Sequence, residues 1–470
     1  PAHCAGDFFV LYSYWESEML YKVKKERLFT NQQLLALLWP LIIEQALGVL
    51  VGMADTVMVS SVGEAAISGV SLVDMINQLI ITVFGALATG GAVVTSQHLG
   101  AKRPEEAARS AGQLVGLSGI LGTAVAVFCL VTRTAQLRLF FGTISEDVMQ
   151  ACLTYFTITA LSFPFLALYN AGAAIFRSTG NSAVSMKVSV LVNAINFCGN
   201  ALCVFVLRMG VAGVAVPTLV SRAVGAVIIL SLAAKRDYVL RITPRTVTRL
   251  EGRTVRSILY IGIPSAFENS LFQLGRVLVV SMISLFGTVH ISANAVANNL
   301  DAVGCIVGNA MGLAMITVVG RCVGAQDFEQ TKHYTKKLLL WDYIAQGTVN
   351  LLVLLFLNRI LGMYTLSPET RALSWMLVMI HDGVAILLWP AGFVLPNALR
   401  AANDVRFTMV TSILSMIVWR MGLSWILCVN MGMGAVGVWL AMVVDWICRV
   451  TCFVIRFASG AWQKSAAKKV

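Results

Sequence analysis

Apolar residues occur along this chain in twelve long blocks, separated by shorter polar stretches. A helix of about 20 residues crosses the roughly 30 Å of hydrocarbon in a bilayer. The pattern therefore predicts an all-α polytopic membrane protein with twelve spans, at residues 34–61, 71–97, 112–132, 150–174, 183–207, 211–233, 257–286, 293–319, 337–358, 374–399, 407–429 and 433–457.

The first and seventh spans repeat one another at a constant offset of 224 residues. Within residues 40–68 and 264–292, nine positions are identical, and in the first copy they are Pro40, Glu44, Leu47, Leu50, Met58, Ser60, Gly63, Ile67 and Ser68. Each half holds six spans, an even number, so both halves enter the membrane in the same direction. We therefore expect two parallel six-helix lobes, residues 22–233 and 257–457, around a central cleft.

Three segments lie outside the predicted lobes. Residues 234–256 are rich in Lys and Arg and connect the two halves, and residues 458–470 form a basic tail. Residues 1–21 form an N-terminal tail, within which Met19 opens a basic amphipathic stretch. We expect Met19 to be the natural start of the protein.

Composition excludes an ordinary soluble domain. Hydrophobic residues make up 58% of the chain and charged residues 12%, whereas about a quarter of the residues are charged in soluble proteins. The ten cysteines show no C-x-x-C pair, which predicts neither a zinc site nor a disulfide framework. The chain has no Walker A lysine loop, and the Gly432-x-Gly434-x-x-Gly437 motif has no preceding strand, so nucleotide binding is not expected.

The distribution of Lys and Arg predicts the orientation. Four arginines lie deep within spans: Arg222, Arg276, Arg420 and Arg449. Five more fall in loops on one side: Arg133, Arg138, Arg208, Arg359 and Arg371. All the remaining Lys and Arg residues fall on the other side, with both termini and the connector. Positive loops stay in the cytoplasm, so we expect both termini there, and the net charge of +12 does not indicate nucleic acid.

The seventh span carries the clearest intramembrane charges, Glu268 and Arg276. Ionisable groups in hydrocarbon are costly and are usually kept for a function. The two residues are eight positions apart, about 80° around a helix and about 12 Å along it, so we expect each to have another partner. Glu268 is the first candidate for a coupling carboxylate, and Arg276 for a counter-charge or a substrate contact.

The first span carries two further carboxylates. Glu44 and Asp55 are eleven positions apart, about 20° around the helix, so they share one face. In the fifth span, Asn196 and Asn200 lie one turn apart, where they either supply oxygen ligands to an ion or hold helices together. All four are candidates for cation or proton coupling.

Weaker candidates occur in the second half. Asp301 and Asp382 are possible substrate or counter-charge residues, expected near span ends where water reaches them. His381 precedes Asp382 and has a side chain that titrates near neutral pH, but a hydrogen-bonded packing histidine is the simpler interpretation.

The order of several motifs resembles the multidrug and toxic compound extrusion (MATE) transporters. The resemblance covers essentially residues 22–457 and is carried by Pro40-Leu-Ile-Ile-Glu-Gln, Ala54-Asp55-Thr56, Leu99-Gly100-Ala101, Phe176-Arg177-Ser178-Thr179-Gly180-Asn181, Gly262-Ile-Pro264-Ser, Val323-Gly324-Ala325 and Leu399-Arg400-Ala-Ala-Asn403-Asp404. It implies a non-enzymatic secondary transporter of the inner membrane, without cofactor or ATP. Such proteins export amphipathic, often cationic small molecules in exchange for inward Na⁺ or H⁺.

The resemblance also implies roles for single residues. Asp55 stands where the family has an aspartate in its first span. Asn196 and Asn200 stand where one branch has an Asn and an Asp, so the second carboxylate of that site is missing here. Glu268 resembles the seventh-span glutamate of another branch, whose tenth-span aspartate is not clearly matched by Asp382. A bound Na⁺ is accordingly expected at Asp55, Asn196 and Asn200, or at Glu268.

Two alternatives remain open from the sequence. One is a lipid-linked oligosaccharide flippase of the same wider superfamily, for which more basic residues would face the cavity. The other is a channel or receptor-like membrane protein, which the whole-chain duplication disfavours. The sequence is compatible with a monomer but does not fix the oligomeric state.

Overall fold

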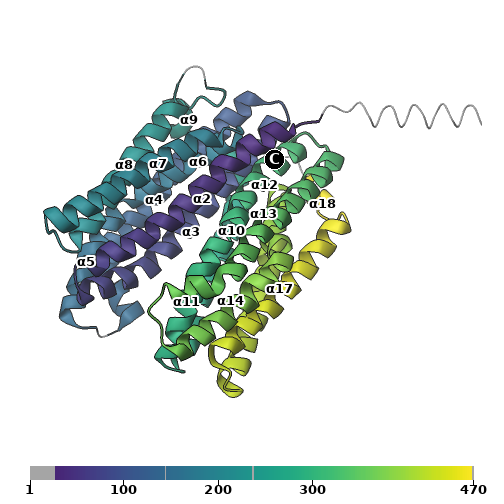
Figure 1. Ribbon diagram of the computed structural model, residues 1–470. Coiled ribbons are helices and arrows are strands. Elements are labelled where there is room, and N and C mark those ends of the chain that lie inside the picture. The colour runs from purple at the N-terminus through teal and green to yellow at the C-terminus, as the bar shows by residue number, and fades with distance from the viewer. Residues whose placement is uncertain (1–26, 143, 236–237, 468–470) are drawn as a thin grey trace, which may run out of the picture. The chain divides into compact units, whose positions relative to one another are not determined.

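The computed structural model describes residues 27–142, 144–235 and 238–467 (Figure 1). The predicted N-terminal tail, with its start at Met19, lies outside these ranges. Contacts separate the chain up to Leu35 from one compact unit, Ala36–Val470. The packing described below is that within the compact unit.

The first lobe, here called the N-lobe, is built from helices α2 to α8. Its elements are α2 (Asn31–Ser60), α3 (Glu64–Gly100), α4 (Pro104–Phe141), α5 (Glu146–Leu161), α6 (Phe163–Ser178), α7 (Ser182–Ala201), a π-helical extension (Leu202–Val206) and α8 (Ala212–Ala233). Helices α5 and α6 meet at an angle of 44° and together form one bent rod. In the interior of the N-lobe, the rings of Phe84 and Phe163 pack edge to face with their centroids 6.2 Å apart.

The connector and the second lobe, the C-lobe, follow. Their elements are α9 (Pro244–Thr248), α10 (Gly252–Ser284), α11 (Thr288–Gly304), α12 (Ile306–Gly324), α13 (Phe328–Gly362), α14 (Pro368–Trp389), a π-turn (Pro390–Val394), α15 (Leu395–Ala401), α16 (Val405–Ser415), π-helical segments Met416–Leu423 and Trp425–Asn430, α17 (Gly434–Ala458) and α18 (Gln463–Ala466).

The structure confirms an all-helical membrane fold. Among the described residues, ten helices are long and apolar enough to cross a membrane, or eleven if the bent pair α5–α6 is one span. Helix α10 is outside this set because Glu268, Asn269, Gln273 and Arg276 interrupt its apolar sequence. Helix α11 is short because it ends at Gly304, where the chain breaks before α12.

The backbone repeats itself between the lobes. Left-handed φ angles occur at equivalent places, namely Gly63 and Gly287 before α3 and α11, Lys102 and Gln326 after α3 and α12, and Gly180 and Asn403 after α6 and α15. A positive φ is unfavourable for residues with a side chain, so Lys102 and Gln326 mark a turn that the tertiary structure imposes on both lobes. The two halves therefore share their turns as well as their spans.

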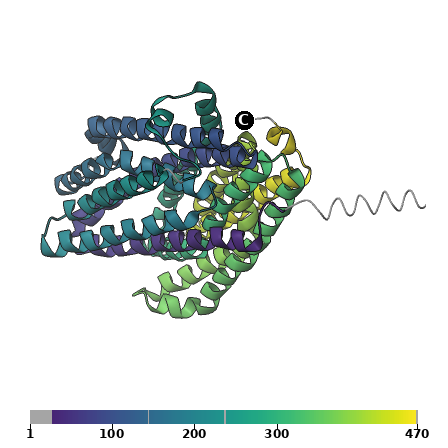
Figure 2. The ribbon, with the colours of Figure 1, turned by 90° about the horizontal axis from the view of Figure 1, so that it is seen from above.

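Helix α3 joins the lobes by packing along α10 and α12 (Figures 1 and 2). At Gly100, the last residue of α3, a side chain would overlap the carbonyl of Arg321, and at Gly324, the last residue of α12, a side chain would overlap that of Gln97. Each glycine thus lets one lobe approach the backbone of the other, with the same 224-residue relation. The lobe contact is itself pseudo-symmetric.

Side chains reinforce this contact at the end of the molecule that holds the connector. The guanidinium of Arg321 donates to the Ser178 carbonyl at 2.9 and 3.2 Å. Gln97 Nε2 donates to the Ala401 carbonyl at 2.8 Å. Toward the opposite end, α10 leaves Leu274, Val277 and Leu278 exposed. The lobes therefore meet at the connector end and are less closely packed at the other.

Candidate functional site

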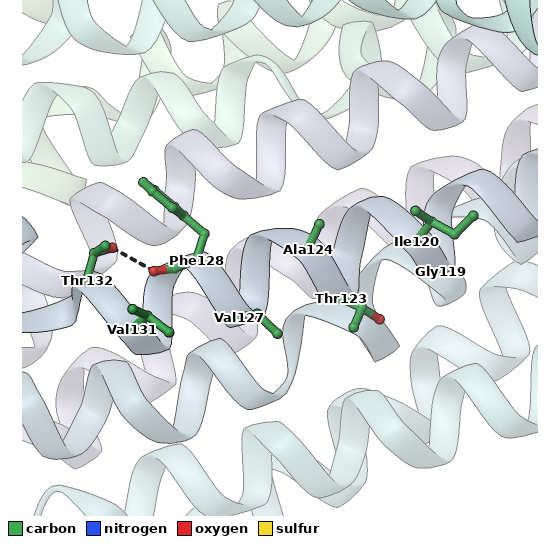
Figure 3. A pocket seen from close by; sticks show the side chains of 8 residues that line it. All are labelled: Gly119, Ile120, Thr123, Ala124, Val127, Phe128, Val131 and Thr132. Carbon is green, nitrogen blue, oxygen red and sulfur yellow. Dashed lines mark hydrogen bonds between the residues drawn. The ribbon is translucent and has the colours of Figure 1, made fainter.

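One large hollow lies on the outer surface of α4 and is not a suitable transport site. It measures about 850 Å³ and is lined by residues of that helix alone (Figure 3). Its few polar groups are the threonines, and Thr132 Oγ1 donates back to the Phe128 carbonyl at 2.6 Å. An apolar surface of this kind suits lipid chains and offers no charge to an ion or a substrate.

Two smaller cavities adjoin one another between α10, α12, α14 and the C-lobe π-turn. Their volumes are about 290 and 370 Å³, and both are bordered by Phe272, Asn309, Trp389 and Phe393. The N-lobe reaches the first through Thr89 and the second through Val49. The cleft is thus a C-lobe chamber that the N-lobe closes on one side.

The chamber combines aromatic walls with arginines. Trp389 stacks on Phe393 at 5.0 Å, and Trp446 meets Phe393 edge-on at 5.7 Å. Arg449 lies 5.6 Å from the rings of both Phe272 and Phe393, and Arg420 lies 5.4 Å from Phe272. Guanidinium groups are weakly hydrated and pack well on aromatic faces, so charge and apolar surface coexist here.

Glu268 lies at the wall of the smaller cavity in a direct ion pair. Its Oε1 is 2.7 Å from Arg400 Nη2, and the carboxylate is 8% exposed. Its Oε2 makes no hydrogen bond to any described residue. Arg276 does not pair with Glu268, as the helical spacing predicts, and instead reaches Asn298 Oδ1 at 3.5 Å.

Glu44 forms the equivalent ion pair in the N-lobe. Its Oε1 is 3.5 Å from Arg177 Nη1, and Ser185 Oγ donates to its Oε2 at 3.1 Å. Glu44 matches Glu268 in the repeat, and Arg177 and Arg400 each stand at the end of an equivalent helix. The two glutamates that the repeat aligns therefore each form an ion pair with an arginine of the same lobe.

Asp55, Asn196 and Asn200 come together in the N-lobe. Asn200 Nδ2 donates to Asp55 Oδ1 at 2.8 Å and to Asn196 Oδ1 at 3.3 Å. Asn196 Nδ2 donates to Thr218 Oγ1 at 2.9 Å. The remaining oxygen, Asn200 Oδ1, is buried and has no partner among the described residues. Glu44 takes no part in these contacts, although it shares the helix with Asp55.

The sequence reasoning missed a third carboxylate within the N-lobe spans, Asp74 of α3. Its Oδ1 accepts from Tyr155 Oη and from Asn77 Nδ2, both at 3.1 Å. Arg222 is close enough to Asp55 and Asp74 for their charges to interact, but its Nη1 donates to Ser162 Oγ at 2.7 Å. The sequence did contain signals for both residues: Asp74 is an acid near the start of the second predicted span, and Arg222 is an arginine within the sixth.

In the C-lobe, Asp301, His381 and Asp382 form a linear triad. His381 Nε2 is 2.9 Å from Asp301 Oδ1, and His381 Nδ1 is 2.7 Å from Asp382 Oδ1. Asp382 and His381 are buried within α14, and Asp301 lies beside the break between α11 and α12. Asp301 borders the larger cavity, whereas Asp382 lies in the interior of the C-lobe.

The described residues offer neither a cluster of metal-ligating side chains nor a disulfide. In residues 27–142, 144–235 and 238–467, no group of three or more His, Cys, Asp or Glu side chains is arranged to hold a metal ion. The cysteines within those ranges are free thiols. The site instead consists of carboxylates, amides and arginines at a helix-lined cavity.

Two repeated helical lobes, buried carboxylates and a C-lobe chamber that the N-lobe closes on one side are features of a multi-pass membrane transporter. A sequence profile of the MatE family matches residues 40–202 and again residues 264–426, the same offset of 224 as the repeat. The chain belongs to this family of MATE transporters.

Individual proteins show the same relationship. The chain is 28% identical to the uncharacterized transporter YisQ of Bacillus subtilis, over 92% of this chain and 96% of that protein. It is 25% identical to the probable multidrug resistance protein NorM of Thermotoga maritima, over 95% and 96%. A solved outward-facing structure of a multidrug resistance MATE family transporter superposes with a TM-score of 0.86 at 20% identity, covering 92% and 96%.

Proposed function

We propose that this transporter exports amphipathic small molecules, including drugs, in exchange for inward Na⁺ or H⁺ by alternating access. The two lobes would rock about the α3 contact and expose the chamber to each side of the membrane in turn. Export requires that the cation and the substrate favour different states of the protein.

The observation that carries the proposal is the Asp55 site. It presents oxygens from Asp55, Asn196, Asn200 and Thr218, of which Asn200 Oδ1 is buried and has no partner in the described chain. Oxygen ligands of this kind suit a hard cation such as Na⁺. Alternatively Asp55 accepts a proton, since even a half-buried carboxylate is costly unless a proton or a cation neutralises it.

The ion pairs argue for Asp55 as the coupling residue ahead of Glu268 and Glu44. Each glutamate has an arginine within 3.5 Å, so its charge is compensated by the protein in the observed state. Asp55 has only an amide partner and makes no ion pair in the described chain. A carboxylate without an ion-pair partner is one that a mobile cation can neutralise.

The chamber suits amphipathic substrates. Its aromatic walls bury apolar surface, and Asp301 and Arg276 place both signs of charge in the larger cavity. A combined volume of several hundred Å³ is typical of sites for drug-sized molecules. The name of the NorM relative, a probable multidrug resistance protein, agrees with this substrate class.

Orientation follows from the charge distribution. The Lys- and Arg-rich connector and both termini would face the cytoplasm. The contacts of Gln97 and Arg321 then close the cytoplasmic end, so the described conformation would be the one open to the outside.

The test is dye efflux from reconstituted vesicles under separately imposed Na⁺ and H⁺ gradients. We expect Asp55→Asn to reduce gradient-driven efflux by about tenfold or more, a typical allosteric coupling. Glu44→Gln is the matched control, because it changes a carboxylate of the same helix that has its own arginine. Efflux that does not change with either gradient would refute the proposed antiport. Efflux by Asp55→Asn that is coupled as in wild type would refute the proposed role of Asp55.

A flippase for anionic lipid-linked substrates is the second candidate, and one observation favours it. Four arginines border the two cavities: Arg276, Arg400, Arg420 and Arg449. Arg400 and Arg449 are paired with Glu268 and Asp445, which reduces the net positive charge. Binding assays with a cationic dye and with a lipid pyrophosphate, compared in wild type and Arg420→Gln, distinguish the two functions. Tighter lipid binding that the variant loses would favour the flippase.

A further inference from the structure

A column of buried polar residues on α13 has no role in the mechanism above. Asp342, Gln346 and Asn350 follow one another at intervals of four residues, so they lie on one face of the helix. All three are at most 1% exposed. Both side-chain polar atoms of each residue lack a hydrogen-bond partner among the described residues.

The column faces glycines at the end of α11 and along α12. A methyl group at Gly304 would overlap Asn350 Oδ1, and a methyl group at Gly308 would overlap Gln346 Oε1. Helices α12 and α13 run in opposite directions, so the same register places Asp342 level with Gly312. The Gly-x-x-x-Gly repeat here admits polar side chains, whereas such repeats usually serve close apolar helix packing.

The column connects to the triad at one end. Asn350 Oδ1 and Asp382 Oδ1 both lie within 4 Å of the position that a Cβ at Gly304 would occupy. Asp382 Oδ2 is a further buried atom without a partner among the described residues. From Asp382 the hydrogen bonds continue through His381 to Asp301, which borders the larger cavity.

The spacing decides what could occupy the column. Residues four apart on a helix are separated by about 6 Å along its axis. Two hydrogen bonds of about 3 Å cover that distance through one water molecule. A single Na⁺ needs several oxygens around one point, which a column about 12 Å long does not provide. The unpartnered amide N–H groups would also repel a cation, whereas they donate readily to water.

We propose that the α13 column holds a chain of water molecules that carries the coupling proton between Asp342 and the Asp301–His381–Asp382 triad. Each step moves one proton from a hydronium to the next water or to a carboxylate, so charge and atoms balance. The proposal rests on cation-coupled export and specifies H⁺ as a cation that this transporter uses.

The charged and titratable groups around Asp342 are few. Cys305 lies within electrostatic range of Asp342, Asp382 and Asp301, and Tyr343 is adjacent on α13. Asp382 of α14 lies near the far end of the column, and His381 bonds to it. Because no arginine or lysine of the described chain bonds to Asp342, a proton is the available means of neutralising its charge.

The test separates proton coupling from substrate transport in reconstituted vesicles. We expect Asp342→Asn to reduce efflux driven by a pH gradient by about tenfold or more. Counterflow, the exchange of labelled for unlabelled dye without net ion movement, should stay within about twofold of wild type. Gln346→Met, which interrupts the water chain without changing a charge, should show the same selective loss. Thr348→Val, on the exposed face of α13, should behave as wild type.

Other outcomes overturn the inference in distinguishable ways. Normal proton-driven efflux in both Asp342→Asn and Gln346→Met would refute the column alone. Equal loss of counterflow and efflux would mean that the column is structural. Wild-type efflux that follows Na⁺ and ignores pH would refute the proton path while leaving antiport intact. Efflux that follows neither gradient would refute the proposed function as well.

Discussion

The two lobes share an ion pair and differ in what surrounds it. Glu44 and Arg177 are separated by 3.5 Å, and Glu268 and Arg400 by 2.7 Å, at equivalent positions of the repeat. In the N-lobe, Ser185 also bonds the glutamate, whereas Glu268 Oε2 has no partner among the described residues. Duplication has therefore retained the pair, and each lobe supports it differently.

The neighbouring polar residues diverge further. At the offset of 224, Asp55 is matched by Val279 and Asn196 by Arg420. The N-lobe thus holds a site of carboxylate and amide oxygens, while the C-lobe holds arginines on aromatic walls. A polar feature present in both lobes is best explained by the scaffold, and one present in a single lobe is the better candidate for function.

Removing the arginine of each pair should give the largest effect. Arg400→Ala leaves Glu268 buried without its ion-pair partner, which costs about 3–5 kcal/mol. Arg177→Ala should cost less, about 1–3 kcal/mol, because Ser185 still donates to Glu44. Thermal unfolding in detergent measures the loss of stability in both variants. Adding Glu268→Gln to Arg400→Ala should recover part of the stability lost in Arg400→Ala. Equal destabilisation by the two single variants would contradict the contrast between the lobes.

The symmetric glycine contacts should give an intermediate effect. Gly100→Val and Gly324→Val each place a side chain against a carbonyl of the opposite lobe. Overpacking of about 1–3 kcal/mol should push the connector end open. Spin labels at Arg103 and Glu329 would report a longer distance for both variants. Gly48→Val is the control, since a Cβ added at Gly48 would meet no atom within 4 Å. An unchanged distance would show that the contact does not hold the lobes together.

An exposed ion pair should give the smallest effect. Arg109 and Glu251 lie 3.4 Å apart near the connector, and their side chains are 50% and 47% exposed. Solvent screens such pairs, so Arg109→Ala should cost no more than about 1 kcal/mol, and less at high salt. Thermal unfolding at two salt concentrations checks this. A loss as large as that of Arg400→Ala would contradict the assumption that burial sets the strength of these pairs.

The sequence alone determined the membrane class, the helical fold and the duplication. The length of an apolar run predicts a helix from that segment alone. The repeat at an offset of 224 residues can be recognised without any structure. The same reasoning found Asp55, Asn196 and Asn200, because a polar residue in an apolar run is conspicuous. It also predicted that Glu268 and Arg276 do not pair with each other, since the geometry of a helix is set by neighbouring residues.

Only the tertiary structure decided which polar residues meet. Arg400 lies far along the chain from Glu268, and no local pattern joins them. Asp301 of α11 and His381 of α14 are likewise distant in the sequence and meet only in the folded chain. Asp342, Gln346 and Asn350 were visible at helical spacing, but only the packing of α13 against the glycines of α11 and α12 shows that they are buried without partners. Helical periodicity is a property of a few consecutive residues, whereas burial and pairing depend on helices distant in sequence.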